Sequence, residues 1–139
     1  MYRNILVPVD LSDRPEPAVR SAADLAGAEG ATVHLLHVIE TIRGVPYEEL
    51  EPFYESLRKR AERALDGWAE LLAARPISVQ REIVFGHRTR EIVKRADDAG
   101  CDLIVICSRR AGPDRPAGGL GTLSHRVALL APCAVLLVR

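Results

Sequence analysis

The sequence predicts an α/β protein whose parallel sheet is covered by helices on both faces. Five short apolar segments alternate along the 139-residue chain with segments in which apolar residues recur at helical spacing. The fourth apolar segment, 103–107, has no polar residue, which is typical of a strand buried on both faces. The resulting order, βαβαβαβαβ, is that of parallel strands joined by right-handed crossover helices.

Strands are expected where β-branched and apolar residues run together, at 5–9, 32–39, 78–85, 103–107 and 134–138. Within 78–85 apolar residues alternate with polar ones. This alternation indicates an edge strand with one wetter face.

Helices are expected between these strands, each bounded by a capping residue, a glycine or a proline. The first runs from 16 to about 28, with Ser12 and Asp13 as capping candidates and Gly30 favoured over Gly27 as its stop. The second begins between 47 and 52 and ends before Pro76, with Trp68 on its apolar stripe as a core residue. The third spans 89–99, and the fourth spans 121–130 with Thr122 or Ser124 as its cap.

Composition narrows the class of protein. The length suits a single domain over residues 1–139. Lys and Arg number 19, as do Asp and Glu, so the net charge of zero disfavours nucleic-acid binding. No apolar run is long enough to span a membrane, and the N-terminus does not resemble a signal peptide. Three cysteines without metal spacing suit a reducing compartment, so we expect a cytoplasmic protein.

Asp10 is the strongest single-residue candidate for a binding site. Ligands of open parallel sheets bind beyond the carboxyl ends of the strands, where the strand order reverses. A carboxylate that ends the first apolar strand can accept hydrogen bonds from ribose hydroxyls or an adenine amine. Asp10 can equally cap the first helix or bond the neighbouring loop, and the sequence leaves both interpretations open.

The segment 108–122 is the second candidate. Its glycines give the backbone freedom, its arginines add positive charge, and hydroxyl side chains at a helix N-terminus attract anions. Together they would suit a phosphate group. The alternative is a surface loop with solvated arginines. Judged on composition alone, this alternative is the favoured interpretation.

Other residues point to packing rather than chemistry. Cys107 ends a buried strand near several arginines, which would suit a redox thiol, but a small buried residue is the favoured interpretation. Cys101 and Cys133 are expected to be packing residues. His87 is expected to lie on the surface without a functional role. No hydrolase or P-loop motif and no metal-ligand spacing is present, so catalysis lacks support.

Four segments resemble the universal stress protein family, in the right order and over essentially the whole chain: "ILVPVDLS", "LLHVIE", "GHRTREIVKRADDAGCDLIVI" and "GTLSHRVALLAPCAVLLVR". The resemblance implies a five-stranded sheet of order 3-2-1-4-5 with an adenine nucleotide alpha hydrolase-like fold. The first and fourth strands would then flank the switch point, with Asp10 opposite the segment 107–122. It also implies a homodimer paired through the last strand, Ala134–Val138.

ATP-binding members of the family carry a motif G-x2-G-x9-G-[S/T] after the fourth strand. This chain keeps its end, Gly121 and Thr122, followed by Ser124, but lacks the first two glycines. One register places Cys107 and Arg110 there, and the other places Ser108 and Ala111. A non-glycine residue forced to positive φ costs about 1–3 kcal/mol, although an arginine could instead bind phosphate oxygens.

The resemblance therefore implies a stress-response binding or regulatory module with a degenerate nucleotide cleft and no catalysis. ATP or another adenine nucleotide is the ligand it implies, with Mg²⁺ only if ATP is bound. Asp10 would hold the ribose and Val38 would lie near the base; the whole predicted site is Pro8, Val9, Asp10, Val38, Cys107, Arg110, Gly121, Thr122 and Ser124. The alternatives are an ATP-binding switch with slow or no hydrolysis, and a structural dimer that acts through a protein partner.

Overall fold

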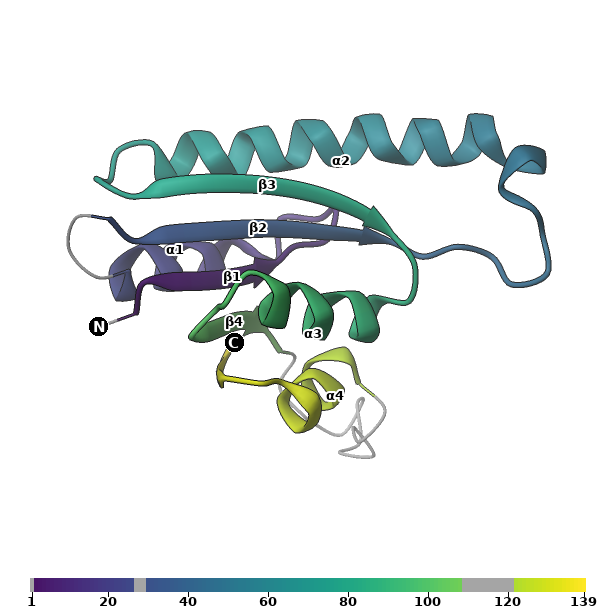
Figure 1. The fold of residues 1–139 in the computed structure, drawn as a ribbon. Coiled ribbons are helices and arrows are strands. Elements are labelled where there is room, and N and C mark those ends of the chain that lie inside the picture. The colour runs from purple at the N-terminus through teal and green to yellow at the C-terminus, as the bar shows by residue number, and fades with distance from the viewer. Residues whose placement is uncertain (1, 27–29, 109–121) are drawn as a thin grey trace, which may run out of the picture.

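The computed structural model describes residues 2–26, 30–108 and 122–139. Figure 1 shows a single twisted sheet with helices on both sides. Its elements in chain order are β1 (Asn4–Pro8), α1 (Glu16–Leu25), β2 (Thr32–Ile39), a 3₁₀ turn (Tyr47–Glu49), α2 (Glu51–Leu72), β3 (Ser78–Phe85), α3 (Arg88–Asp98), β4 (Leu103–Cys107), α4 (Leu123–Leu130) and β5 (Ala134–Val138). The α/β class and the alternation of elements are confirmed.

The strand order is β3-β2-β1-β4-β5, and every pair is parallel. Ile5 lies between Val33 of β2 and Leu103 of β4, so β1 and β4 are neighbours. From β1, the chain therefore adds β2 and β3 on one side of β1. It then crosses to the other side of β1 and adds β4 and β5. This reversal creates a switch point between β1 and β4, as the predicted order requires.

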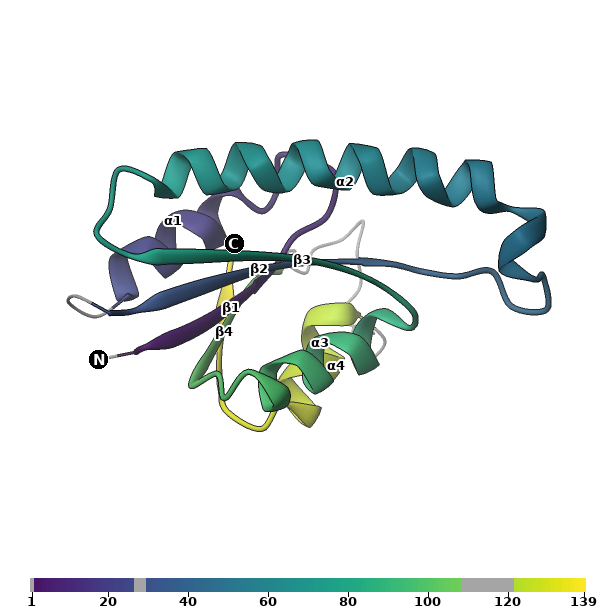
Figure 2. The same ribbon diagram turned by 45° about the horizontal axis from the view of Figure 1, so that its top comes forward.

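Two separate cores form because successive side chains of a strand point to opposite faces. Helices α1 and α2 cover one face, and α3 and α4 cover the other (Figures 1 and 2). Ile5 and Val105 pack on the α1 and α2 side, whereas Leu6 and Ile104 pack on the α3 and α4 side. These four side chains lie in β1 and β4, and each is 0% exposed. The centre of the sheet is therefore buried on both faces.

Strand boundaries match the sequence prediction closely. β2, β3, β4 and β5 have the expected bounds, and β1 begins and ends one residue earlier than 5–9. β3 is an edge strand, as its alternation indicated. Trp68 is partly buried and packs against the core beneath α2, which agrees with its predicted role.

The first helix differs from its prediction at both ends. It stops at Leu25, not near 28, because Ala26 leaves the helical conformation (φ −57°, ψ 128°) and forms a parallel bridge with Tyr2. At its start, Pro15 occupies the N-cap position and no side chain caps the helix, so the expectation for Ser12 and Asp13 is wrong. Asp13 contributes only its carbonyl oxygen, which accepts from the Glu16 N–H at 3.2 Å.

The last two helices begin with side-chain caps. His87 precedes α3, and its Nδ1 accepts from the Arg90 N–H at 3.5 Å. α4 begins at Leu123, and the Oγ1 of Thr122 accepts from the His125 N–H at 3.4 Å. Of the two predicted caps for α4, the structure thus selects Thr122. Within the described ranges, no helix has the length and apolar character needed to cross a membrane.

Candidate functional site

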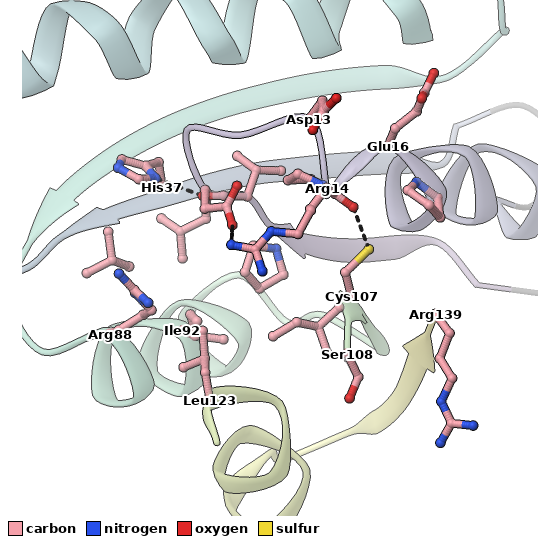
Figure 3. A pocket seen from close by; sticks show the side chains of 18 residues that line it. Asp13, Arg14, Glu16, His37, Arg88, Ile92, Cys107, Ser108, Leu123 and Arg139 are labelled. Carbon is pink, nitrogen blue, oxygen red and sulfur yellow. Dashed lines mark hydrogen bonds and ion pairs between the residues drawn. The ribbon is translucent and has the colours of Figure 1, made fainter. Parts of the chain in front are cut away.

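A cleft of about 450 Å³ opens at the carboxyl ends of β1, β2 and β4 (Figure 3). Its floor is apolar, because side chains from β2, β4, α3 and α4 meet there: Leu36, Val38, Ile106, Ile92 and Leu123. Its rim is charged, with carboxylates from Asp10, Asp13 and Glu16 and guanidinium groups from Arg14, Arg88 and Arg139. An apolar floor with a few polar groups at its rim is typical of small-molecule sites.

Most of the predicted site residues that the structure describes line this cleft: Pro8, Val9, Asp10, Val38 and Cys107. Thr122 and Ser124 flank Leu123, whose side chain lines it. Arg110 and Gly121 lie outside the described residues. The topology thus brings together strand ends that are nearly a hundred residues apart in the sequence.

Asp10 bonds its own loop. Its Oδ1 accepts from the backbone N–H of Ser12 at 2.8 Å and from the Ser12 hydroxyl at 2.5 Å. The other oxygen, Oδ2, lies 3.9 Å from Nη2 of Arg14 in a half-exposed ion pair. The loop-bonding alternative is therefore the one seen here. Because that network uses mainly Oδ1, Oδ2 retains the capacity to accept from a ligand hydroxyl.

His37 joins the ends of β1 and β2 behind the cleft. Its Nδ1–H donates to the carbonyl oxygen of Val9 at 2.7 Å, and the Val9 N–H donates to the Leu36 carbonyl at 2.8 Å. The ring is only 8% exposed, and burial lowers the pKa of His37 below its ordinary value despite that hydrogen bond. His37 is therefore a neutral, positioned ring at neutral pH.

The thiol of Cys107 donates to the carbonyl oxygen of Arg14 at 3.0 Å (Figure 3). This contact ties the end of β4 to the loop that precedes α1. Burial raises the pKa of Cys107, and the nearby Asp10 carboxylate acts in the same direction. The thiol is thus protonated at neutral pH, which favours its packing interpretation over a reactive thiolate.

A hydroxyl pair joins the first turn of α4 to the end of β4. Ser124 is 8% exposed, and its hydroxyl donates to the Ser108 hydroxyl at 3.1 Å. Ser108 directly follows β4, so the bond holds the first turn of α4 against the strand end. The positive end of the α4 dipole consequently lies beside the cleft, where it favours an anion.

Sequence reasoning did not single out the three arginines of the rim. Arg14 and Arg88 come a few residues after β1 and β3, and Arg139 directly follows β5. Arg88 Nε lies 3.5 Å from Oε1 of Glu40, which directly follows β2, so the end of β2 is linked to the start of α3. All three would have been found if the residues considered at each strand end had included the next few positions of the chain.

The fold is that of a doubly wound α/β protein, and the cleft lies at its switch point. A family model described as the universal stress protein family matches residues 1–139. The chain belongs to that family. A universal stress protein of Thermus aquaticus is 36% identical and universal stress protein G of Escherichia coli O157:H7 is 30% identical, and each match covers 100% of both chains.

Solved structures agree with this assignment. Universal stress protein UspA from Lactobacillus plantarum is 28% identical, with a TM-score of 0.78 over 99% of this chain and 98% of its own. The universal stress protein from Archaeoglobus fulgidus in complex with dAMP is 22% identical, with a TM-score of 0.71 over 99% and 98% of the two chains. A family protein from Arabidopsis thaliana with AMP bound is 17% identical, with a TM-score of 0.69 over 98% and 90%. At these last two identities the likeness shows the fold alone.

Proposed function

We propose that this protein is a non-catalytic regulatory module of the cytoplasm whose cleft binds an adenine nucleotide. The observation that supports the proposal most directly is the cleft at the β1/β4 switch point, with an apolar floor and a charged rim. The relatives solved with dAMP and with AMP share this fold.

In this proposal the base packs on the apolar floor beside Val38, and a ribose hydroxyl donates to Oδ2 of Asp10. The phosphate lies toward the N-terminus of α4, near Thr122 and Ser124, with Gly121 before them in the sequence. Arg14 lies beside the ribose position and adds a positive charge. Pro8 and Val9 form the wall between base and ribose.

A nucleoside monophosphate suits the site better than ATP. The described part of the lining carries three carboxylates and three guanidinium groups, so it offers no excess positive charge to a triphosphate. The first two motif glycines are also missing, whether Cys107 and Arg110 or Ser108 and Ala111 stand in their place. Each forced positive φ would cost about 1–3 kcal/mol. Magnesium would enter only with a triphosphate.

Titration calorimetry tests this proposal. Wild-type protein should bind AMP with a dissociation constant at or below the millimolar range, and ATP with Mg²⁺ no more tightly. Asp10→Ala should weaken AMP binding about tenfold, because it removes the ribose acceptor. Asp97→Ala, an exposed substitution on α3, is the control and should leave binding unchanged. Absence of heat with either nucleotide at millimolar concentration would refute the nucleotide proposal.

We also propose that the protein is a homodimer paired through Ala134–Val138. β5 is an edge strand, and its Leu136 and Leu137 are 38% and 44% exposed. An apolar strand at an open edge favours pairing with another chain. A structural dimer that acts through a protein partner is the second candidate function, and it is favoured if dimerisation is found without nucleotide binding.

A further inference from the structure

Two cysteines lie beside each other at the end of the sheet opposite the cleft. Cys101 comes two residues before β4, and Cys133 comes directly before β5. In the parallel pairing of these strands Leu103 is opposite Ala134. Extending this register by one step places Asp102 opposite Cys133, so Cys101 is offset from Cys133 by a single residue.

The register sets the distance between the two backbones. Neighbouring strands lie about 4.8 Å apart and one residue advances about 3.3 Å, so a regular continuation of β4 and β5 would separate the two Cα atoms by roughly 6 Å. Disulfides span Cα separations of about 4.4–6.8 Å. The backbone geometry therefore permits a bond without a large movement of either strand.

Both side chains also lie on the same face of the sheet. Cys101 is a buried member of the core under α3 and α4, 8% exposed, and Cys133 packs against that same core. A regular strand would send side chains offset by one residue to opposite faces, but both cysteines precede the regular strands. The two thiols are near enough that Cys133 contributes to the raised pKa of Cys101.

We propose that Cys101 and Cys133 form a redox-sensitive pair, which hydrogen peroxide converts into a disulfide bridging the starts of β4 and β5. The Cys133 sulfur attacks one peroxide oxygen, an S–O bond forms, the O–O bond breaks, and the departing hydroxide takes the thiol proton to leave as water. The Cys101 sulfur then attacks the resulting sulfenic acid; the S–S bond forms, and the S–O bond breaks to release a second water. The two thiols are oxidised by two electrons, and the peroxide is reduced by two.

Differences in burial set the order of these steps. Burial raises the pKa of Cys101 to about 11 and raises that of Cys133 as well, so little thiolate is present at neutral pH and oxidation is slow. Cys133 is the more exposed of the two and reacts first. Cys107 lies at the other end of β4, bonded to the Arg14 carbonyl, and takes no part in the pair.

The bond would reinforce one edge of the sheet. Only β4 pairs with β5 among the described strands, so the edge strand depends on one ladder. A disulfide from 101 to 133 closes a long loop and thereby reduces the entropy of the unfolded chain. For a domain of this size the expected rise in Tm is about 10 °C.

Peptide mapping after peroxide treatment of the full chain tests the proposal. In the Cys107→Ala variant, trypsin separates the cysteines into the peptides 96–109 and 127–139. After oxidation and without reductant, these peptides should appear as one cross-linked species lacking two hydrogens. Both free thiols should be lost, Tm should rise by about 10 °C, and dithiothreitol should reverse both changes.

Matched variants keep the result decisive. Cys107→Ala combined with Cys133→Ala, or with Cys101→Ala, should show neither the cross-link nor the rise in Tm. A bond between the Cys133 residues of two chains, seen as a doubled mass on a non-reducing gel, would overturn the proposal. So would sulfinic acid without cross-linking, or thiols at 101 and 133 that stay free while wild-type Cys107 is oxidised.

Discussion

The two edges of the sheet differ in how they meet solvent. β3 presents charged side chains that are engaged by neighbouring helices: Arg81 pairs with Asp66 of α2, and Glu82 lies 3.2 Å from Arg95 of α3. β5 presents Leu136 and Leu137, which remain 38% and 44% exposed although Val135 and Val138 pack against the two cores. Charges at an edge oppose the addition of another strand, whereas an apolar edge invites it.

This difference assigns separate roles to the two edges. The charged side chains of the β3 edge find their ionic partners within the same chain, since helices on both sides of the sheet supply them. In the proposed dimer, a second chain would complete the β5 edge. Two leucines of α4, Leu129 and Leu130, are also 69% and 62% exposed. Substitutions at the two edges should therefore affect different properties.

The largest expected effect is on self-association. Leu136→Asp combined with Leu137→Asp places two charges in the proposed interface and should weaken dimerisation at least a hundredfold, because burying unpaired carboxylates is strongly unfavourable. Sedimentation velocity at micromolar concentration should show a dimer for the wild type and a monomer for the variant. Arg81→Ala on the opposite edge is the matched control and should remain dimeric. A wild type that sediments as a monomer would contradict the assignment of β5 as an interface.

A smaller effect is expected on stability at the β3 edge. Glu82→Gln removes the charge partner of Arg95, whose side chain is 29% exposed, and should lower the free energy of unfolding by about 1 kcal/mol. Urea unfolding monitored by circular dichroism measures this loss. The dimer should persist, since β5 is untouched. A stability equal to that of the wild type would show that Arg95 is satisfied by solvent.

Acidification should lower the free energy of unfolding through two histidines of β2. Burial lowers the pKa of both His34 and His37, so between the ordinary histidine pKa of about 6.5 and the lower folded values the unfolded chain binds more protons. Stability should therefore be retained above pH 7 and decline as the pH falls through 6.

His34 adds to this dependence because of its surroundings. Its Nε2 lies 3.3 Å from the Asn4 side-chain oxygen, and its buried Nδ1 has no hydrogen-bond partner among the described residues. Arg95 opposes a positive charge on the ring, whereas Glu82 favours it. Urea unfolding of His34→Gln between pH 5 and 8 should give a flatter pH profile than the wild type. An unchanged slope would show that His34 does not titrate in this range.

The smallest effect is expected from the exposed ion pair of the β3 edge. Arg81→Ala removes its contact with Asp66, and both side chains are at least half exposed, so the change in the free energy of unfolding should stay below about 0.5 kcal/mol. Urea unfolding at low and high salt provides the measurement. A loss well above 1 kcal/mol would mean that this edge depends on the pair more than its exposure indicates.

The accuracy of the sequence predictions follows the strength of the local signal. Both ends of four strands were predicted correctly because β-branched and apolar runs ended at clear breakers, as 103–107 does between Asp102 and Ser108. The end of α1 was missed, since the bridge between Ala26 and Tyr2 that ends the helix joins distant residues. The motif segment after β4 depended on a family pattern rather than on a local signal, and Arg110 and Gly121 remain predictions.

By itself the sequence determined the class of fold, the strand positions and the set of strand-end residues, because hydrophobic periodicity and turn residues are local properties of the chain. The strand order, and with it which strand ends meet, was predicted from the family resemblance. Only the tertiary structure decided that Asp10 bonds Ser12 and lies beside Arg14, and that Cys101 lies near Cys133. These relations depend on strand order and register. Both are set by burial of side chains far apart in sequence, which no local pattern encodes.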